Sequence, residues 1–408
     1  MMRRYLASSK STVMRCGRIV IVLLVAYAAA ISYKASAEAG QSSSEAVTRA
    51  ATPTPDDRNQ GVFYMMMAGS STLPLPLPPH AKGVFMSVSW SQVEPKKGVF
   101  DWTPITNVES QLQDGQYLQV AIVVGAYGSP TSVAACSFRG KTIAGCTPWL
   151  GTASGIKIHS TIGVNGANNG YPACTTLVEP NPADPVYIYG WEGLVNGFER
   201  QFRGDKKIAM VSIQPMSDVG FNLSLSTVNS REVTVCSPEY YNQDWDKLSG
   251  CKGNESCWQT YVENAFRTLW SYEVSHLPDQ NLVLWNPSYA FPNVTSIDGG
   301  YDFDIRNAVL QFASANHPTG GGTYELANEA LQASLSWDNA VRRWAPGADR
   351  LGAQMARSNA DSCSALKSAG IDYGASNGAG WIEIYRPDFD ACPEEIGQIS
   401  AAMGGTRN

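Results

Sequence analysis

The sequence predicts an α/β fold, a (β/α)8 or TIM barrel in which long, disulfide-bonded loops follow some of the strands. Short β-branched or apolar runs alternate with helical stretches, which is typical of a parallel sheet. Eight such runs are present, the number that a closed barrel requires. Residues 120–124 are apolar without interruption, as expected of a strand that is buried on both faces.

The elements follow one another in the order that this fold needs. The strands are expected at 61–67, 83–90, 117–124, 207–214, 281–285, 308–312, 350–355 and 380–385. The clearest helices are expected at 103–113, 187–203, 258–275 and 324–340. Among the strands, 308–312 has the weakest pattern.

The most informative segment joins the second strand to the first helix. It reads Trp90-Ser-Gln-Val-Glu94-Pro95-Lys-Lys-Gly98-Val-Phe100-Asp101-Trp102. Pro95 fixes its own φ and biases Glu94 away from helix, while Gly98 can take a left-handed conformation. Asp101 is placed to cap the helix that follows. The segment therefore predicts a strand, a tight turn and a helix.

This segment resembles the second strand, turn and helix of the (β/α)8-barrel glycoside hydrolases, which carry W-x-x-[VI]-E-P-x-x-G-x-[FY]-[DN]-W. The resemblance is strongest to the clan that includes families 5, 39 and 42. It extends loosely over residues 61–390 and firmly over 83–124. It implies a carbohydrate substrate, two catalytic carboxylates and no cofactor.

Length and composition fit one large domain behind a leader. Of 408 residues 44% are hydrophobic, enough for one large core. Residues 1–37 combine early basic residues, an apolar run at 19–31 and Ala35-Ser-Ala37, which indicates a cleaved signal peptide rather than a membrane anchor. Residues 38–60 are expected to be a disordered linker, and 61–408 a single barrel domain. We expect a secreted or periplasmic monomer without stable membrane insertion.

The charge balance argues against a nucleic-acid partner. Residues 1–37 carry six Lys and Arg and no acid, so the remainder has 24 basic and 36 acidic residues and a net charge of −12. No basic cluster interrupts this acidic balance, whereas phosphate backbones are bound by Lys and Arg. The simplest interpretation of the charge is solubility.

Eight cysteines follow the leader, an even number that favours disulfides in an exported chain. Spacing suggests the pairs Cys136–Cys146, Cys251–Cys257 and Cys363–Cys392, which leaves Cys174 with Cys236. A metal site is not expected, because no histidine lies at ligand spacing from a cysteine pair; the four are His80, His159, His276 and His317.

Two long insertions, 126–186 and 216–257, carry three of these cysteines each. They follow strands three and four, on the side where barrels build their binding loops. They are either a shaped substrate cleft or plain surface elaboration.

The resemblance fails at the two positions that carry the chemistry in the clan. There, the acid/base is a Glu that ends strand four and the nucleophile is a Glu that ends strand seven. The matching residues here are Gln214 and Gln354. Because an amide cannot replace a carboxylic acid as a proton donor, three explanations stay open. The carboxylates have moved, the chain no longer hydrolyses, or the matching is shifted.

The nearest replacement carboxylates are Glu383 and Asp218. Glu383 lies on the eighth predicted strand, where Trp381, Glu383 and Tyr385 share one side. A charge on so apolar a strand is costly unless it is paired or used, so a structural salt bridge is the alternative. Asp218 lies four residues beyond Gln214 and could instead form a turn.

Aromatic residues gather at the predicted rim of the barrel. Ring faces pack against the C–H faces of sugars, and amides bind hydroxyls. The expected substrate-binding rings are Trp90, Tyr127, Trp285, Tyr289, Trp381 and Tyr385, and the expected amides are Gln214, Asn286 and Gln354. Each ring alone is more often part of a core.

Two other acids have structural interpretations. Glu94 is expected to hold the turn of the Glu-Pro-x-x-Gly motif. Glu325 follows the Gly-rich residues 319–324 and is expected at a helix N-terminus, where a carboxylate is favourable.

Three functions are compatible with the sequence. The favoured one is a secreted glycoside hydrolase that cleaves O-glycosidic bonds of a polysaccharide or oligosaccharide with Glu383 and Asp218. The second is a catalytically silent, carbohydrate-binding barrel. The third is a barrel with another activity, and the fold alone does not indicate which reaction that would be.

Overall fold

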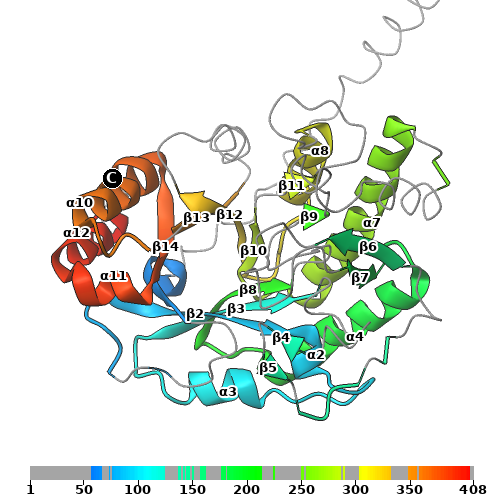
Figure 1. Cartoon of the computed structure of the whole chain (residues 1–408), viewed down its shortest axis with the longest axis horizontal. Coiled ribbons are helices and arrows are strands. Elements are labelled where there is room, and N and C mark those ends of the chain that lie inside the picture. The colour runs from blue at the N-terminus through cyan, green and yellow to red at the C-terminus, as the bar shows by residue number, and fades with distance from the viewer. Residues whose placement is uncertain are drawn as a thin grey trace, which may run out of the picture. The chain divides into compact units, whose positions relative to one another are not determined.

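Eight parallel strands close into a barrel (Figure 1). In this computed structural model the described residues are 57–66, 73, 76–124, 137–138, 141–142, 144–147, 149–150, 157–161, 176–180, 182–213, 224–225, 250–251, 254–285, 288–289, 303–331, 348–355 and 358–404. In barrel order the strands are β1 (Gly61–Met65), β2 (Ala81–Ser89), β3 (Tyr117–Val123), β8 (Ile208–Ile213), β10 (Leu282–Trp285), β12 (Tyr324–Leu331), β13 (Arg350–Met355) and β14 (Ala379–Tyr385). β14 pairs with β1, so the ring is complete and the TIM barrel is confirmed.

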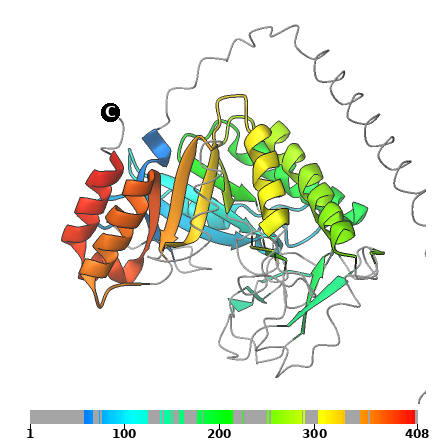
Figure 2. The same cartoon turned by 90° about the horizontal axis from the view of Figure 1, so that it is seen from above.

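Helices cover the outside of this ring. They are α2 (Trp90–Val93), α3 (Thr103–Glu109), α4 (Pro185–Phe202), α7 (Glu255–His276), α8 (Phe303–Ala315), α10 (Cys363–Lys367), α11 (Arg386–Ala391) and α12 (Pro393–Gly404), with shorter turns η1 (Asp57–Asn59), η6 (Ser368–Gly374) and η7 (Ala375–Asn377). α7 and α8 lie side by side on one flank, while α12 lies beside β14 and α10 packs against α12 (Figures 1 and 2).

Small two-stranded sheets lie outside the barrel. Their strands are β4 (Ser137–Phe138), β5 (Lys141–Thr142), β6 (Lys157–Thr161), β7 (Thr176–Pro180), β9 (Ser224–Leu225) and β11 (Ser288–Tyr289). Five of these six fall within the two predicted insertions, after β3 and β8. The insertions therefore contain local strands.

Side chains that cap helices set the starts of the two longest ones. Asp184 accepts a hydrogen bond from the backbone amide of Val186, at 2.8 Å, and Pro185 occupies the first helical position of α4. Asn254 accepts one from the amide of Cys257, at 3.0 Å, and begins α7. These caps satisfy amides that have no partner inside the helix.

Seven of the eight predicted strands are confirmed, and the sixth is wrong. Residues 308–312 lie inside α8, and the predicted helix at 324–340 begins with strand β12. A short apolar run does not distinguish strand from helix by periodicity alone. In α8 the buried residues Arg306, Val309, Leu310 and Ala313 follow helical spacing. In β12, Glu and Leu have high helix propensity, but barrel closure imposes the strand.

The described chain begins at Asp57, inside the segment that the sequence assigns to a disordered linker. Asp57–Asn59 form η1, and Asn59 is fully buried. The predicted signal peptide, and the linker up to residue 56, lie outside the described residues. Within the described part of the chain, no helix is long and apolar enough to cross a membrane.

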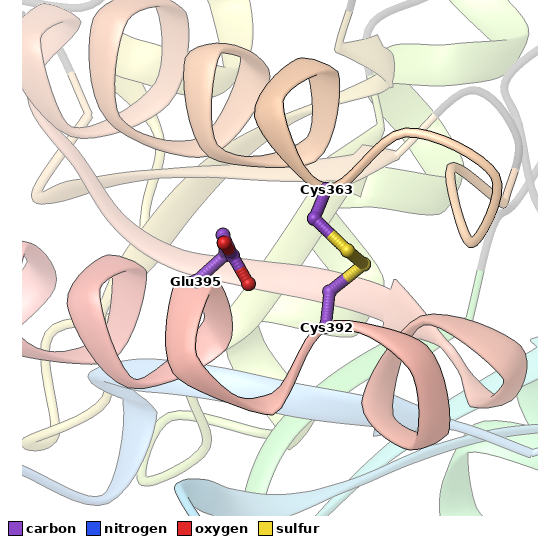
Figure 3. A group of neighbouring side chains, drawn as sticks. All are labelled: Cys363, Cys392 and Glu395. Carbon is purple, nitrogen blue, oxygen red and sulfur yellow. A yellow bond between two sulfur atoms is a disulfide. The ribbon is translucent and has the colours of Figure 1, made fainter.

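Two of the predicted disulfides are confirmed, Cys251–Cys257 and Cys363–Cys392. Cys146 is also disulfide-bonded, but its expected partner Cys136, like Cys174 and Cys236, lies outside the described residues. The bridge from Cys363 to Cys392 ties the start of α10 to the segment before α12, next to Glu395 (Figure 3). Because the two sulfur atoms are bonded to each other, this cluster offers no thiolate pair for a metal.

Replacing both Cys363 and Cys392 with serine should lower the free energy of unfolding by about 3.5 kcal/mol, because a disulfide restricts the unfolded chain. This bridge joins residues 29 apart, whereas Cys251–Cys257 joins residues only 6 apart. The matched Cys251/Cys257 double variant should therefore lose less, about 2 kcal/mol. Urea unfolding without reductant measures both, and an equal or reversed ranking would contradict the loop-closure explanation.

Burial raises the pKa of one helix carboxyl. Glu273 of α7 is 2% exposed, and burial raises its pKa well above 4.5, although a backbone hydrogen bond from Ile213 acts in the opposite direction. A carboxyl with a raised pKa binds its proton more tightly in the folded than in the unfolded chain. Its contribution to stability is therefore complete below about pH 4.5 and is lost as pH rises through the folded pKa.

A Glu273→Gln variant should remove this component of the pH dependence, since glutamine has a similar shape and does not titrate. The wild-type free energy of unfolding should fall above pH 4.5 at up to about 1.4 kcal/mol per pH unit from this group. The difference in Tm between variant and wild type, measured from pH 4 to pH 8, should grow with pH in favour of the variant. A constant difference would show that Glu273 is not the titrating group.

Candidate active site

The inner face of β14 presents a tryptophan and a carboxylate to the barrel interior. Trp381 belongs to the inner hydrophobic cluster, while Ile382 and Ile384 belong to the outer one. Glu383 is two residues beyond Trp381 on the same face and is fully buried. Because parallel strands run from the N-terminal to the C-terminal end of the barrel, Glu383 lies nearer the end where barrels carry their active sites.

Gln354 of β13 holds this carboxylate. The two residues are register partners, and Gln354 Nε2 donates a hydrogen bond of 2.7 Å to Glu383 Oε2. Gln354 is 3% exposed. The structure thus brings together two of the predicted site residues, Glu383 and Gln354.

Aromatic rings fill the barrel below this pair. Trp285 of β10 makes edge contacts with Phe85 of β2 at 6.3 Å and with Trp381 at 6.0 Å between ring centroids. Gly352 of β13 makes room for Trp381, because a Cβ there would lie 2.0 Å from its indole. All three rings are at most 1% exposed. Trp285 and Trp381 therefore form the floor under Glu383 and are part of the packed core.

A second buried carboxylate lies at the N-terminal end of the barrel. Glu325 of β12 accepts hydrogen bonds from Asn59 Nδ2, Trp381 Nε1 and Thr323 Oγ1. Arg350 donates to Asn59 and lowers the Glu325 pKa electrostatically, yet burial is the larger effect and raises that pKa to about 7. The expectation that Glu325 starts a helix is wrong, because Gly320–322 lead directly into β12.

Glu94 holds the turn after β2, as expected. Its carboxylate accepts hydrogen bonds from Trp90 Nε1 at 2.6 Å and from the Gly98 amide at 2.7 Å. Burial raises its pKa to about 7 against these hydrogen bonds and the Lys97 charge. Trp149 Nε1 donates to the Glu94 backbone carbonyl, so the motif also anchors the loop after β3.

Two of the predicted rim aromatics lie elsewhere. Trp90 is fully buried in the outer core, in edge contact with Trp149 and Tyr187, and is not part of the inner cluster that contains Trp285 and Trp381. Tyr385 ends β14, precedes α11 and packs against the outer core, because the strand alternation stops there.

The remaining predicted site residues lie outside the described residues. They are the candidate acid Asp218 and the substrate-binding candidates Tyr127, Gln214 and Asn286; the side chain of Tyr289 is also outside. Their roles stay predictions.

Two buried polar residues of the barrel were missed by the sequence analysis. Gln119 of β3 is fully buried on the same face as Ala121 and Val123, and among the described residues neither of its amide atoms has a hydrogen-bond partner. Asp388 of α11 accepts hydrogen bonds from Ser358 Oγ and the Asn359 amide, both at 2.7 Å. A polar residue inside an apolar strand was the available signal for Gln119. Asp388 fixes the loop after β13 to the end of β14.

Known structures share this architecture only at a distance. Endoglycoceramidase II from Rhodococcus sp. is 10% identical with a TM-score of 0.43, over 86% of this chain and 80% of that one. A broad-specificity endoglucanase from an uncultured bacterium is 10% identical with a TM-score of 0.40, over 87% and 98%. An exo-β-1,4-mannosidase from Opitutaceae bacterium strain TAV5 is 10% identical with a TM-score of 0.40, over 82% and 54%.

The chain thus spans about half the length of that mannosidase. No known family profile matches the sequence, and no curated protein matches it. The barrel assignment rests on the strand order given above, and no site residue is transferred from these structures.

Replacing Arg350 with methionine should destabilise the fold by about 3–5 kcal/mol, because the buried Glu325 loses the cation next to it. An Arg350→Met/Glu325→Gln double variant should recover much of that loss, since no buried charge is then left without compensation. Urea unfolding of the wild type, the two single variants and the double variant measures the coupling. Additive losses would show that Glu325 and Arg350 do not act as a pair.

Proposed function

We propose that this protein is a glycoside hydrolase that cleaves O-glycosidic bonds of a polysaccharide or oligosaccharide. One observation carries the proposal. A carboxylate, Glu383, lies on the inner face of the eighth strand above two tryptophans and is oriented by Gln354. In (β/α)8-barrel enzymes, the catalytic residues lie at the C-terminal ends of the strands.

The proposed chemistry needs two carboxyl groups. One donates a proton to the leaving glycosidic oxygen as the C1–O bond breaks, and the other attacks C1 or activates the water that adds to it. The overall reaction consumes one water, whose hydroxyl ends on C1 and whose proton restores the acid. Glu383 Oε2 already accepts a hydrogen bond from Gln354, which suits the attacking or base role. Asp218 is then the proposed acid.

This assignment explains the two amides at the family positions. Gln354 stands where the family nucleophile is expected, and Glu383 is its hydrogen-bonded neighbour one strand further around the barrel. We infer that the carboxylate of the nucleophile has moved by one strand. In the chain, Asp218 lies four residues beyond Gln214, so the acid is proposed to come from the segment that follows β8.

A carbohydrate-binding barrel without hydrolysis is the second candidate. It is favoured by the full burial of Glu383, which the substrate must reach before any bond is cleaved. The two candidates differ in one measurable property, the release of new reducing ends from a glycan that the protein binds.

We also propose that the protein acts outside the cytoplasm, in the medium or the periplasm. The confirmed disulfides support this, because disulfides persist in oxidising compartments. The apolar run at 19–31 with its preceding basic residues supports it as well.

A Glu383→Gln variant should lose turnover by at least about 10³-fold, because an amide neither attacks C1 nor activates water. The assay is the release of reducing ends from plant, microbial and capsular glycans. Asp218→Asn should cause a similar loss on substrates with a poor leaving group and a smaller one on activated aryl glycosides, which need less protonation.

Glu325→Gln is the matched control, since it removes a buried carboxylate from the opposite end of the same barrel. It should lower Tm while the folded protein keeps its kcat. Full activity in both Glu383→Gln and Asp218→Asn would refute the proposed catalytic pair. Binding without cleavage by the wild type would favour the second candidate.

A further inference from the structure

A groove on the outer flank of the barrel has the features of a second binding site. It has a volume of about 380 Å³ and lies between the turn after α2, helix α4 and the end of α7. This volume falls within the range of roughly 300–1,000 Å³ that is typical of small-molecule sites. Its walls include the rings of Phe100, Trp149, Tyr189 and Tyr272. None of these belongs to the inner barrel cluster around Trp285.

An exposed aromatic ring stands at the groove. Tyr189 is 66% exposed, the most of any exposed large hydrophobic side chain in the described part of the chain. Lys97 lies over its ring at 5.5 Å from the centroid, which holds the ring in place. An exposed ring beside a groove can pack against an apolar face of a ligand.

A glycine without a packing reason lies on the groove wall. Helix α4 carries Gly190, Gly193 and Gly197, each costing roughly 1 kcal/mol against alanine in a helix. At Gly190 a Cβ would approach Leu150 to 3.1 Å, and at Gly197 it would lie 2.7 Å from Phe100. At Gly193 a Cβ would meet nothing within 4 Å, although this residue also lines the groove. Because Gly193 has no side chain, this part of the groove is open.

The polar groups in the groove are mixed and balanced. Glu192, Asn196 and Arg200 follow one another at intervals of four residues along α4, and all three line the groove. Asn196 Nδ2 donates to Tyr272 Oη at 2.7 Å. With Lys97 and Glu94 the groove has two cations and two carboxyls. This balance suits an uncharged ligand that both donates and accepts hydrogen bonds.

We propose that this groove binds a neutral oligosaccharide segment, apart from the site in the barrel. The rings of Tyr189 and Trp149 supply flat apolar faces for sugar C–H groups, and Glu192, Asn196 and Arg200 supply partners for hydroxyls. The choice of ligand class rests on the proposed function, but the groove itself does not depend on hydrolysis. It would hold a polymeric substrate on the protein surface.

Gly193→Leu tests the groove with little risk to the fold, since the new side chain enters open space and the helix gains a better helix former. The probes are neutral glucans, mannans and galactans, with alginate and polygalacturonate as acidic counterparts. Dissociation constants are measured by affinity electrophoresis in a Glu383→Gln background, so that no probe is cleaved. Gly193→Leu and Tyr189→Ala should each weaken binding of a neutral polymer about tenfold.

Val186→Leu is the matched control, on the same helix but outside the groove. It should leave binding unchanged, and Gly193→Ala should raise Tm while keeping most of the affinity. With Glu383 intact, Gly193→Leu should raise KM for the polymer about tenfold and leave kcat unchanged, while short soluble substrates show no effect.

Unchanged binding in both groove variants, binding of acidic polymers alone, or no binding of any neutral polymer would each overturn the inference. Loss of binding in Gly193→Leu together with no hydrolysis by the wild type would leave the groove standing and remove the proposed hydrolase activity. Hydrolysis by the wild type that no groove variant changes would support the hydrolase activity and overturn the groove as a binding site.

Discussion

The rest of the structure depends on how the interior of the closed barrel is filled. Side chains at alternate positions of all eight strands point inward, and together they leave no pore. Here, Phe85, Trp285 and Trp381 fill the middle, and Gly352 supplies the space that the Trp381 indole needs. So large a ring layer separates the two ends of the barrel from each other. Polar residues on the strands therefore have different surroundings according to the end at which they lie.

Two buried glutamates show this difference. Glu325 lies at the N-terminal end among several hydrogen-bond donors and next to Arg350, an arrangement that ties η1, β12 and β13 together. Glu383 lies beyond the rings and accepts a hydrogen bond from a neutral amide. A buried carboxylate beside a cation is compensated by that cation. This difference in position and partners supports the proposal that Glu383 takes part in the chemistry, while Glu325 contributes to stability.

Much of the barrel could be predicted from the sequence, because strands buried on both faces are short apolar runs. The turn at Glu94 was predictable as well, since Pro95 and Gly98 permit few backbone conformations. The sixth strand was not, because Tyr324–Leu331 consists largely of helix-forming residues and its conformation is imposed by β10 and β13 on either side. That Glu383 and Trp381 share one face followed from alternation, but that this face is the inner one needed the structure. The Gln354 contact needed the register between two strands distant in sequence.

The position of Trp90 shows why the strand-end aromatics did not all form one site. Trp90 follows β2 directly, but its indole donates to Glu94 and turns to the outer core under α4. The same turn positions Phe100 against Gly197 and brings Trp149 near Gly190. The motif that predicts the barrel thus builds the outer flank and its groove, while the candidate catalytic carboxylate comes from the opposite end of the sequence. Since β1 joins β2 to β14, closing the barrel is what holds the two regions in one domain.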